Sequence, residues 1–260
     1  MKDWSEDPLV RVECTDEAWR GFDPRPLPWE DARAKRPLPE GFLRAKKSVS
    51  RVVLETNALG EHVFVKQSLP VTLRNRLSQR IVGSKSMREL AVTAAYTRAG
   101  IRTVDALMAA DARSGANYLV TRGAPAGWEP LDDVFAREGL QRELLDELAG
   151  YTCWLHQIPA WHSDYRTDHI WWTGAPGKAP MSERFALIDL DGCSIGRRVT
   201  QRQRARALHQ LFMSLDRHGI DEEQTTRFLE LYDPRRQGRF KARRVLARAR
   251  AARAKALETK

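Results

Sequence analysis

The hydrophobic pattern of this 260-residue chain changes its period close to residue 123. Between residues 41 and 123 the apolar residues stand in short β-branched and aromatic runs, which are typical of strands. From residue 124 onward they recur at i, i+3 and i+4, the spacing of helices that bury one face. The order predicts an α+β protein in which a small sheet-rich part precedes a mainly helical part.

The sheet-rich part is expected to hold five strands and one helix. A turn near residues 57–60 separates two of the runs, so the first three predict an antiparallel meander. A Gly at residue 100 marks the end of the helix. The expected strands are residues 42–46, 51–56, 62–67, 104–110 and 117–122, and the expected helix covers residues 85–100.

The second part is expected to be built on a long helix around residues 144–155, which ends before Pro159. Strand-like runs follow at residues 169–172 and 185–191. Two further helices are expected around residues 208–215 and 228–232.

The two ends of the chain differ from the middle in composition. Residues 1–40 hold six prolines together with Trp4, Trp19 and Trp29, so they predict an irregular extension whose tryptophans dock onto the body. Residues 235–260 carry 11 Lys or Arg against a single acid, and the preceding residues are balanced in charge. The expected divisions are therefore residues 1–40, 41–123, 124–234 and 235–260.

Composition excludes several protein classes. Hydrophobic residues make up 42% and charged residues 30%, which is normal for a folded globular protein. The three cysteines lie far apart without CxxC spacing, which argues against a disulfide framework or a zinc site. Without an apolar stretch as long as a membrane span or a signal-peptide core, the expected location is the cytoplasm.

The net charge of +10 is a property of the tail, and three interpretations of it stay open. The tail could be a solvated, partly helical end. It could instead contact an anionic inner-membrane surface or a phosphate-bearing acceptor. Binding to nucleic acid is the weakest of the three.

Two acidic positions have the placement that phosphoryl transfer requires. This reaction needs neutralised nucleotide phosphates, a bound metal and a base that accepts the proton of the acceptor hydroxyl. Asp164, in the run HSDYRTDH after the long helix, is the expected base. Asp189 follows the apolar run 185–188 and is the expected metal ligand. Asp191 ranks lower, as a second ligand on the same side if the strand continues.

His169 stands five residues after Asp164, where a kinase usually has an Asn that binds metal. A neutral imidazole can coordinate a cation, although Mg²⁺ prefers oxygen ligands. The alternative is a core histidine bonded to a backbone group. His162 is expected to be structural and to pack beneath the metal-binding strand.

Lys66, at the end of the run HVFVK, is the expected ligand of the ATP phosphates, and Glu89 on the following helix is its expected partner. A helix-surface pair between Glu89 and Lys85 is the alternative. The turn after the first strand of the meander lacks the GxGxxG pattern. Phosphate contacts there would come from a short cluster, Lys46, Lys47 and Ser48.

These residues resemble the lipopolysaccharide kinases that phosphorylate heptose or Kdo sugars, a divergent branch of the protein-kinase-like fold. The resemblance spans residues 48–233 and is strongest over 155–191. It rests on LHQ before HSD, on His at the Asn position, on IDLD in place of Asp-Phe-Gly, and on the run RFLELY.

The resemblance implies a two-lobed kinase fold, with an antiparallel-sheet N-lobe and a mainly helical C-lobe. It implies Asp164 as base, Asp189 and His169 at Mg²⁺, and Lys66 on ATP. The implied acceptor is a sugar hydroxyl of a lipid-linked oligosaccharide at the cytoplasmic face of the inner membrane. Two alternatives remain: a catalytically impaired pseudokinase or binding module, and a kinase of a small molecule or protein.

Overall fold

The structure, a computed structural model, describes residues 7–47, 51–70, 72, 77, 79, 81–174, 179–233, 247 and 251. The chain divides into two compact units. Unit 1 comprises Met1–Ala94 and Val104–Pro125, and unit 2 comprises Ala95–Thr103 and Ala126–Lys260.

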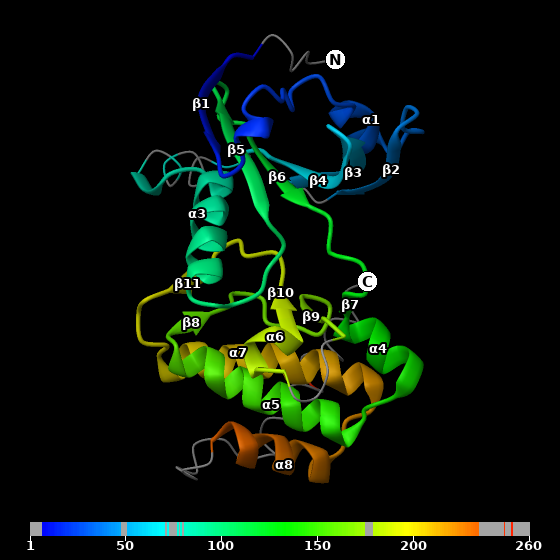
Figure 1. Cartoon of the computed structure of the whole chain (residues 1–260), viewed down its shortest axis with the longest axis vertical. Coiled ribbons are helices and arrows are strands. Elements are labelled where there is room, and N and C mark those ends of the chain that lie inside the picture. The colour runs from blue at the N-terminus through cyan, green and yellow to red at the C-terminus, as the bar shows by residue number, and fades with distance from the viewer. Residues whose placement is uncertain are drawn as a thin grey trace. The chain divides into compact units, whose positions relative to one another are not determined.

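Unit 1 is built on a six-stranded antiparallel sheet (Figure 1). Its strands lie in the order β1-β5-β6-β4-β3-β2, so the expected meander of β2, β3 and β4 is confirmed. The other two expected strands are confirmed as well. The strands are β1 (Leu9–Cys14), β2 (Phe42–Lys47), β3 (Arg51–Ala58), β4 (Glu61–Ser68), β5 (Ala106–Ala112) and β6 (Asn117–Arg122).

The strand that sequence patterns missed is β1, at one edge of this sheet. It pairs with β5 through its backbone, and Val10 and Val12 on it are 60% and 40% exposed. Val10, Val12 and Cys14 alternate with Arg11 and Glu13 as in a strand, but the prolines spread over residues 1–40 led to the prediction of an irregular extension. The extension is therefore more regular than expected, since it also forms the short helix α1 (Trp29–Ala34).

Two tryptophans of the extension confirm the expected docking. Trp19 and Trp29 are 1% and 0% exposed and join the core cluster that contains Val52, Leu54 and Val65. The indole Nε1 of Trp29 donates to the carbonyl of Pro24 over 2.8 Å, so burial leaves its polar atom bonded. Trp4 lies outside the described residues.

The other face of the sheet carries a second core cluster. Met87 and Leu90 of helix α3 (Lys85–Arg98) pack with Ala109 and Leu119. Leu119 alternates along β6 with Tyr118 and Val120, which belong to the first cluster, so the two clusters lie on opposite faces.

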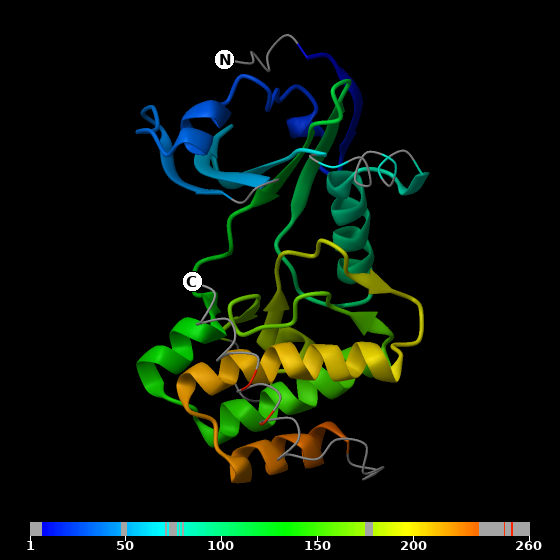
Figure 2. The ribbon, with the colours of Figure 1, turned by 180° about the vertical axis from the view of Figure 1, so that it is seen from behind.

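Unit 2 is mainly helical, and α8 packs against α5 (Figures 1 and 2). The three helices expected from the sequence are confirmed as α5, α7 and α8, whereas α4 and α6 were not expected. Both α7 and α8 begin with a capping box, Thr200 with Gln203 and Asp221 with Gln224. The helices are α4 (Leu131–Glu138), α5 (Arg142–Gln157), α6 (Met181–Arg184), α7 (Gln201–Leu215) and α8 (Glu222–Tyr232).

Five short strands complete unit 2 and form two small antiparallel sheets. One sheet has the order β10-β9-β7 and the other pairs β11 with β8. The strands are β7 (Glu129–Pro130), β8 (Ala160–Trp161), β9 (Ile170–Trp172), β10 (Phe185–Leu187) and β11 (Ser194–Ile195). Within the described ranges no helix is both long and apolar enough to cross a membrane.

Candidate active site

Lys66 and Glu89 form a nearly buried ion pair in unit 1. The Nζ atom of Lys66 donates to Oε1 of Glu89 over 2.7 Å, and the two side chains are 14% and 6% exposed. Lys66 lies on β4 and Glu89 on α3, so the pair joins the sheet to the helix. The expected pairing is confirmed, and the surface pair with Lys85 is wrong because α3 turns Glu89 toward the sheet.

The other predicted nucleotide ligands lie where little is described. Lys46 and Lys47 are the last two residues of β2, and their side chains are outside the described part of the structure. Ser48 lies outside the described residues altogether.

In unit 2, Asp164 lies in the loop between β8 and β9 and its side chain is 41% exposed. The loop is fixed from beneath by His162, which is buried. His162 Nε2 contacts the carbonyl oxygen of Ile188 over 2.9 Å, and its Nδ1 accepts from the amide of Asp164 over 3.2 Å. These partners define one tautomer, with the proton on Nε2.

Burial lowers the pKa of His162 to about 4 and outweighs the opposing effect of the bond to Ile188. The ring is therefore neutral near pH 7, which the bond from the Asp164 amide requires. Asp164 and Asp189 both act on this ring electrostatically, so the imidazole lies near both carboxylates. His162 links the loop to the chain segment that carries Asp189.

Gln210 on α7 holds the same loop from another side. Its Nε2 donates to the carbonyl of Ser163 over 3.1 Å and to Oδ1 of Asp164 over 3.2 Å. Its Oε1 accepts from the amide of Tyr165 over 3.4 Å. One side-chain amide thus contacts three consecutive residues and fixes the orientation of the Asp164 carboxylate.

Arg166 bridges the acidic groups of the loop. Its Nε lies 3.1 Å from Oδ1 of Asp164, and its Nη2 lies 3.2 Å from Oδ2 of Asp168. The same Nη2 is 3.3 Å from Nε2 of His169, whose Nδ1 lies 2.9 Å from the carbonyl of Asp164. Since Nδ1 must donate to that carbonyl, Nε2 carries the lone pair and faces a guanidinium.

Asp132, at the start of α4, anchors the far end of the loop. Its Oδ1 accepts from Thr167 Oγ1 over 2.7 Å, from Arg217 over 2.8 Å and from His218 over 2.8 Å. Burial opposes ionisation of this carboxyl, but the hydrogen bonds from His218 and Thr167 prevail and hold its pKa below the ordinary value. The loop that carries Asp164 is therefore fixed at both ends.

Asp189 has a backbone conformation that few residues other than glycine adopt. Its φ is +55°, in the left-handed region, two residues after β10 ends at Leu187. An aspartate tolerates this region better than most residues, and such strain concentrates at functional sites.

Asp191 does not share a strand with Asp189. β10 ends at Leu187 and the chain then turns, with the amide of Cys193 donating to the carbonyl of Leu190, so no continuing strand places the two carboxylates on one side. The carbonyl of Asp191 accepts from Ser163 Oγ over 2.6 Å, which ties the turn to the loop.

The residues present fit a magnesium ion held mainly by substrate. Mg²⁺ is commonly bound through one or two carboxylates together with phosphate oxygens and water. Asp189 is the residue that would supply such a carboxylate. Among the described residues no cluster of three or more His, Cys, Asp or Glu side chains could hold a metal by itself. Coordination by His169 would require Arg166 to leave its Nε2.

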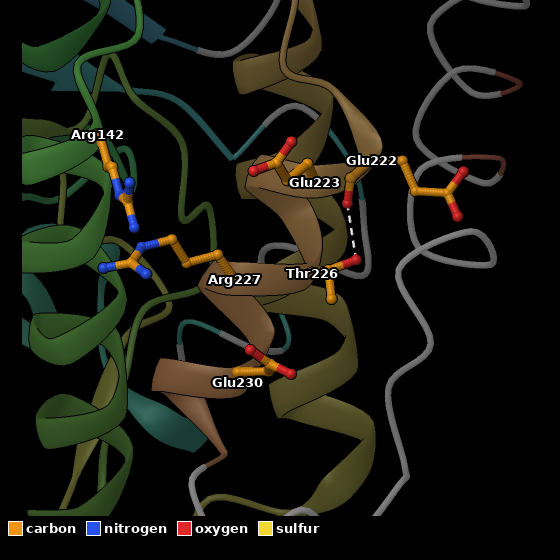
Figure 3. Close-up of a pocket in the computed structure, with 6 residues that line it drawn as sticks. All are labelled: Arg142, Glu222, Glu223, Thr226, Arg227 and Glu230. Atoms are coloured by element: carbon orange, nitrogen blue, oxygen red, sulfur yellow. Dashed lines mark hydrogen bonds between the residues drawn. The ribbon is translucent and has the colours of Figure 1, made fainter.

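A surface pocket elsewhere in unit 2 contains none of these residues. Arg142 of α5 lines it together with residues of α8, including Glu223 and Glu230 (Figure 3). Arg227, which also lines it, forms an ion pair with Asp146. The pocket mixes both signs of charge on two helix surfaces, and we do not assign it to the site.

Comparison with protein families decides the identity of the chain. The model of the lipopolysaccharide kinase (Kdo/WaaP) family matches residues 42–232. The chain belongs to this family. The match includes Lys66, Glu89, Asp164, His169 and Asp189, and leaves the basic tail outside.

One solved structure shows the kinase-like fold of this lipopolysaccharide kinase family member. WaaP in complex with acyl carrier protein has 22% sequence identity and a TM-score of 0.55, over 96% of this chain and 99% of that chain. WbdD has 18% identity and a TM-score of 0.47, over 82% of this chain and 46% of that chain. Comparison with curated proteins gave no match. The expectation of an α+β, protein-kinase-like fold is confirmed.

Two residues of this family member that hold Asp164 were not singled out from the sequence. Arg166 lies inside the run HSDYRTDH and could have been noticed there. Gln210 carries no local signal, because it lies 46 residues from Asp164 and resembles any polar residue on an amphipathic helix.

Proposed function

We propose that this member of the lipopolysaccharide kinase family transfers the γ-phosphoryl group of ATP to a hydroxyl of a heptose or Kdo sugar in the inner core. The observation that carries the proposal is the placement of Asp164. Its carboxylate is 41% exposed, while His162, Gln210 and the Asp132 anchor fix the loop around it. Fixing a loop so that one carboxylate stays accessible suits a catalytic base.

In the proposed reaction Asp164 accepts the proton of the acceptor hydroxyl as its oxygen forms a bond to the γ-phosphorus. The bond from that phosphorus to the β,γ-bridging oxygen breaks, and ADP leaves. Lys66, held by Glu89, neutralises charge on the α- and β-phosphates. Asp189 is the proposed ligand of Mg²⁺, which when bound would neutralise the charge on the phosphate oxygens.

A transfer assay tests this proposal. Labelled phosphate from ATP should appear in deacylated inner-core oligosaccharide when Mg²⁺ is present. Asp164→Ala should abolish the transfer, whereas Asp133→Asn, which removes an exposed carboxylate of α4, should not. Transfer at the wild-type rate by Asp164→Ala would refute the mechanism.

ATP titration separates an active kinase from a binding module that has lost catalysis. A kinase of the proposed type binds ATP more tightly with Mg²⁺ than without it. If millimolar ATP shows no metal-dependent binding, the non-catalytic alternative holds. If ATP binds and only a small molecule or a protein is phosphorylated, the acceptor proposal fails while the chemistry stands.

We further propose that the protein works in the cytoplasm at the inner-membrane surface, and that the basic tail provides the contact. The 11 Lys or Arg against one acid in residues 235–260 support this. Removing these residues should weaken binding to phosphatidylglycerol vesicles and leave transfer to a soluble acceptor intact. Unchanged vesicle binding would exclude this role of the tail.

A further inference from the structure

A stretch of unit 2 beside the loop that carries Asp164 has positively charged side chains and no negatively charged ones. Residues 192–215 contain five arginines and no acid. The stretch begins just after Asp191, includes β11 and runs to the end of α7. β11 pairs with β8, with Ser194 opposite Trp161, so the stretch is attached to the strand that leads directly into His162.

Four of these arginines are exposed and lack a carboxylate partner among the described residues. They are Arg197, Arg198, Arg202 and Arg206. The fifth, Arg204, is turned inward and donates to the carbonyl of His156 over 3.1 Å. Several other arginines of unit 2 are paired with carboxylates: Arg137 with Glu129, Arg184 with Glu147 and Arg227 with Asp146.

Two of these four arginines, Arg202 and Arg206, lie on the same helix face as Gln210, which bonds Asp164. Arg202, Arg206 and Gln210 are spaced four residues apart on α7, so they lie along one face of the helix. The helical rise places Arg206 about 6 Å and Arg202 about 12 Å along the axis from Gln210. The guanidinium carbon of Arg206 lies 6.0 Å from the ring centroid of Trp161, which keeps it beside the loop.

This arrangement opposes the usual charge preference of a helix. The first turn of α7 contains Arg202 and no acidic residue, although a helix N-terminus favours negative side chains. By contrast, α4 and α8 each carry two acids in their first turn. Among the described residues no carboxylate compensates the charge of Arg202, and departures of this kind from local charge preference are expected at functional sites.

We infer that Arg202 and Arg206, with Arg197 and Arg198 beside them, bind an anionic group of the acceptor saccharide, a carboxylate or a phosphate. The inference rests on the proposed function and names the feature of the acceptor that the enzyme recognises. Arginine binds such groups with charge-assisted hydrogen bonds, often two at once. An acceptor held along this face has its anionic group on the arginines and its reactive hydroxyl toward Asp164.

The test measures acceptor binding directly, without ATP. Wild type and Arg202→Gln/Arg206→Gln are titrated calorimetrically with deacylated inner-core oligosaccharide, and with the same oligosaccharide after carboxyl reduction and dephosphorylation. The double variant should bind the charged oligosaccharide roughly tenfold or more weakly. It should bind the neutral one as wild type does, and Arg202→Lys/Arg206→Lys should restore part of the lost affinity.

The matched control is Arg98→Gln/Arg113→Gln, which removes two exposed positive charges outside this stretch. This control should bind the charged and the neutral oligosaccharide with the affinities of wild type. The inference is wrong if the two double variants bind the charged oligosaccharide alike, or if wild type does not bind it at all. The inference is also wrong if Arg202→Gln/Arg206→Gln loses binding only to phosphatidylglycerol vesicles, since the arginines would then contact the membrane and not the acceptor.

Failure of this inference can be told apart from failure of the proposed function. If wild type binds the charged oligosaccharide through these arginines but transfers no phosphate to it, the inference stands and the function fails. If transfer occurs and the affinity does not depend on the arginines, the function stands and the inference fails.

Discussion

Gln210 donates a hydrogen bond to Oδ1 of Asp164 over 3.2 Å, so a residue of α7 orients the proposed catalytic base. The same side-chain amide also bonds the backbone of Ser163 and Tyr165. A glutamine can do this because it offers a donor and an acceptor at once. We regard Gln210 as a positioning residue that acts through Asp164.

Gln210→Glu should lower kcat roughly tenfold to a hundredfold, because the donor to Asp164 is lost and the loop shifts. The acidic limb of the kcat profile should also move to higher pH, since two adjacent carboxyl groups hold a proton more readily than one. Gln201→Glu adds the same charge at the exposed start of α7 and should change neither. An unshifted pH profile with a reduced kcat would indicate a purely structural role.

Asp164→Asn should reduce kcat by about a hundredfold to ten-thousandfold with a smaller effect on the KM for ATP, because the base acts in the chemical step. Steady-state kinetics with saturating acceptor provides the measurement. A kcat within twofold of wild type would remove Asp164 from the mechanism.

Lys66→Met and Glu89→Gln should both raise the KM for ATP, since each breaks the ion pair that positions Lys66. Glu89→Gln keeps the size of the side chain and should have the smaller effect. Fluorescent-nucleotide binding separates affinity from turnover. Lys85→Met, which tests the alternative partner of Glu89, should leave ATP affinity unchanged.

His162 should make the protein less stable in mild acid. Its folded pKa of about 4 lies below the ordinary histidine value, so the unfolded chain binds the proton first as the pH falls. The stability that the neutral His162 ring gives the folded state is present at pH 7. It is lost progressively from about pH 6.5 down to about pH 4. Between pH 7 and pH 4.5 this group alone should lower the free energy of unfolding by about 2 kcal/mol.

Urea unfolding at the two pH values measures this effect, and His162→Gln is the informative variant. It should be less stable than wild type at pH 7, yet its free energy of unfolding should fall less on acidification. His156, which burial also holds at a pKa of about 3, adds a similar slope in both proteins and cancels in the comparison. Equal losses in both proteins would contradict the assignment.

Trp29→Ala should destabilise the protein by about 3–5 kcal/mol, because it empties a fully buried position and removes the anchor of the N-terminal extension. Thermal or chemical unfolding of the full chain gives the value. Val10→Ala, at a position that is 60% exposed on β1, should stay within about 0.5 kcal/mol of wild type.

The sequence alone determined the elements whose side chains alternate between core and solvent. The meander, α3, α5, α7 and α8 follow from local apolar spacing, and the order of Lys66, Asp164 and Asp189 follows from motif spacing. These properties are local, so a single sequence carries them. The roles of these residues in ATP and metal binding stay proposals.

Tertiary structure decided what depends on distant partners. β1 exists because its backbone pairs with β5, a distant partner that the local alternation of its residues does not specify. Glu89 meets Lys66 because the sheet and the helix pack together, and Gln210 meets Asp164 across 46 residues. Asp189 and Asp191 do not lie on one strand, because β10 ends at Leu187. Contacts of this kind are set by how whole elements pack, so spacing in the sequence does not reveal them.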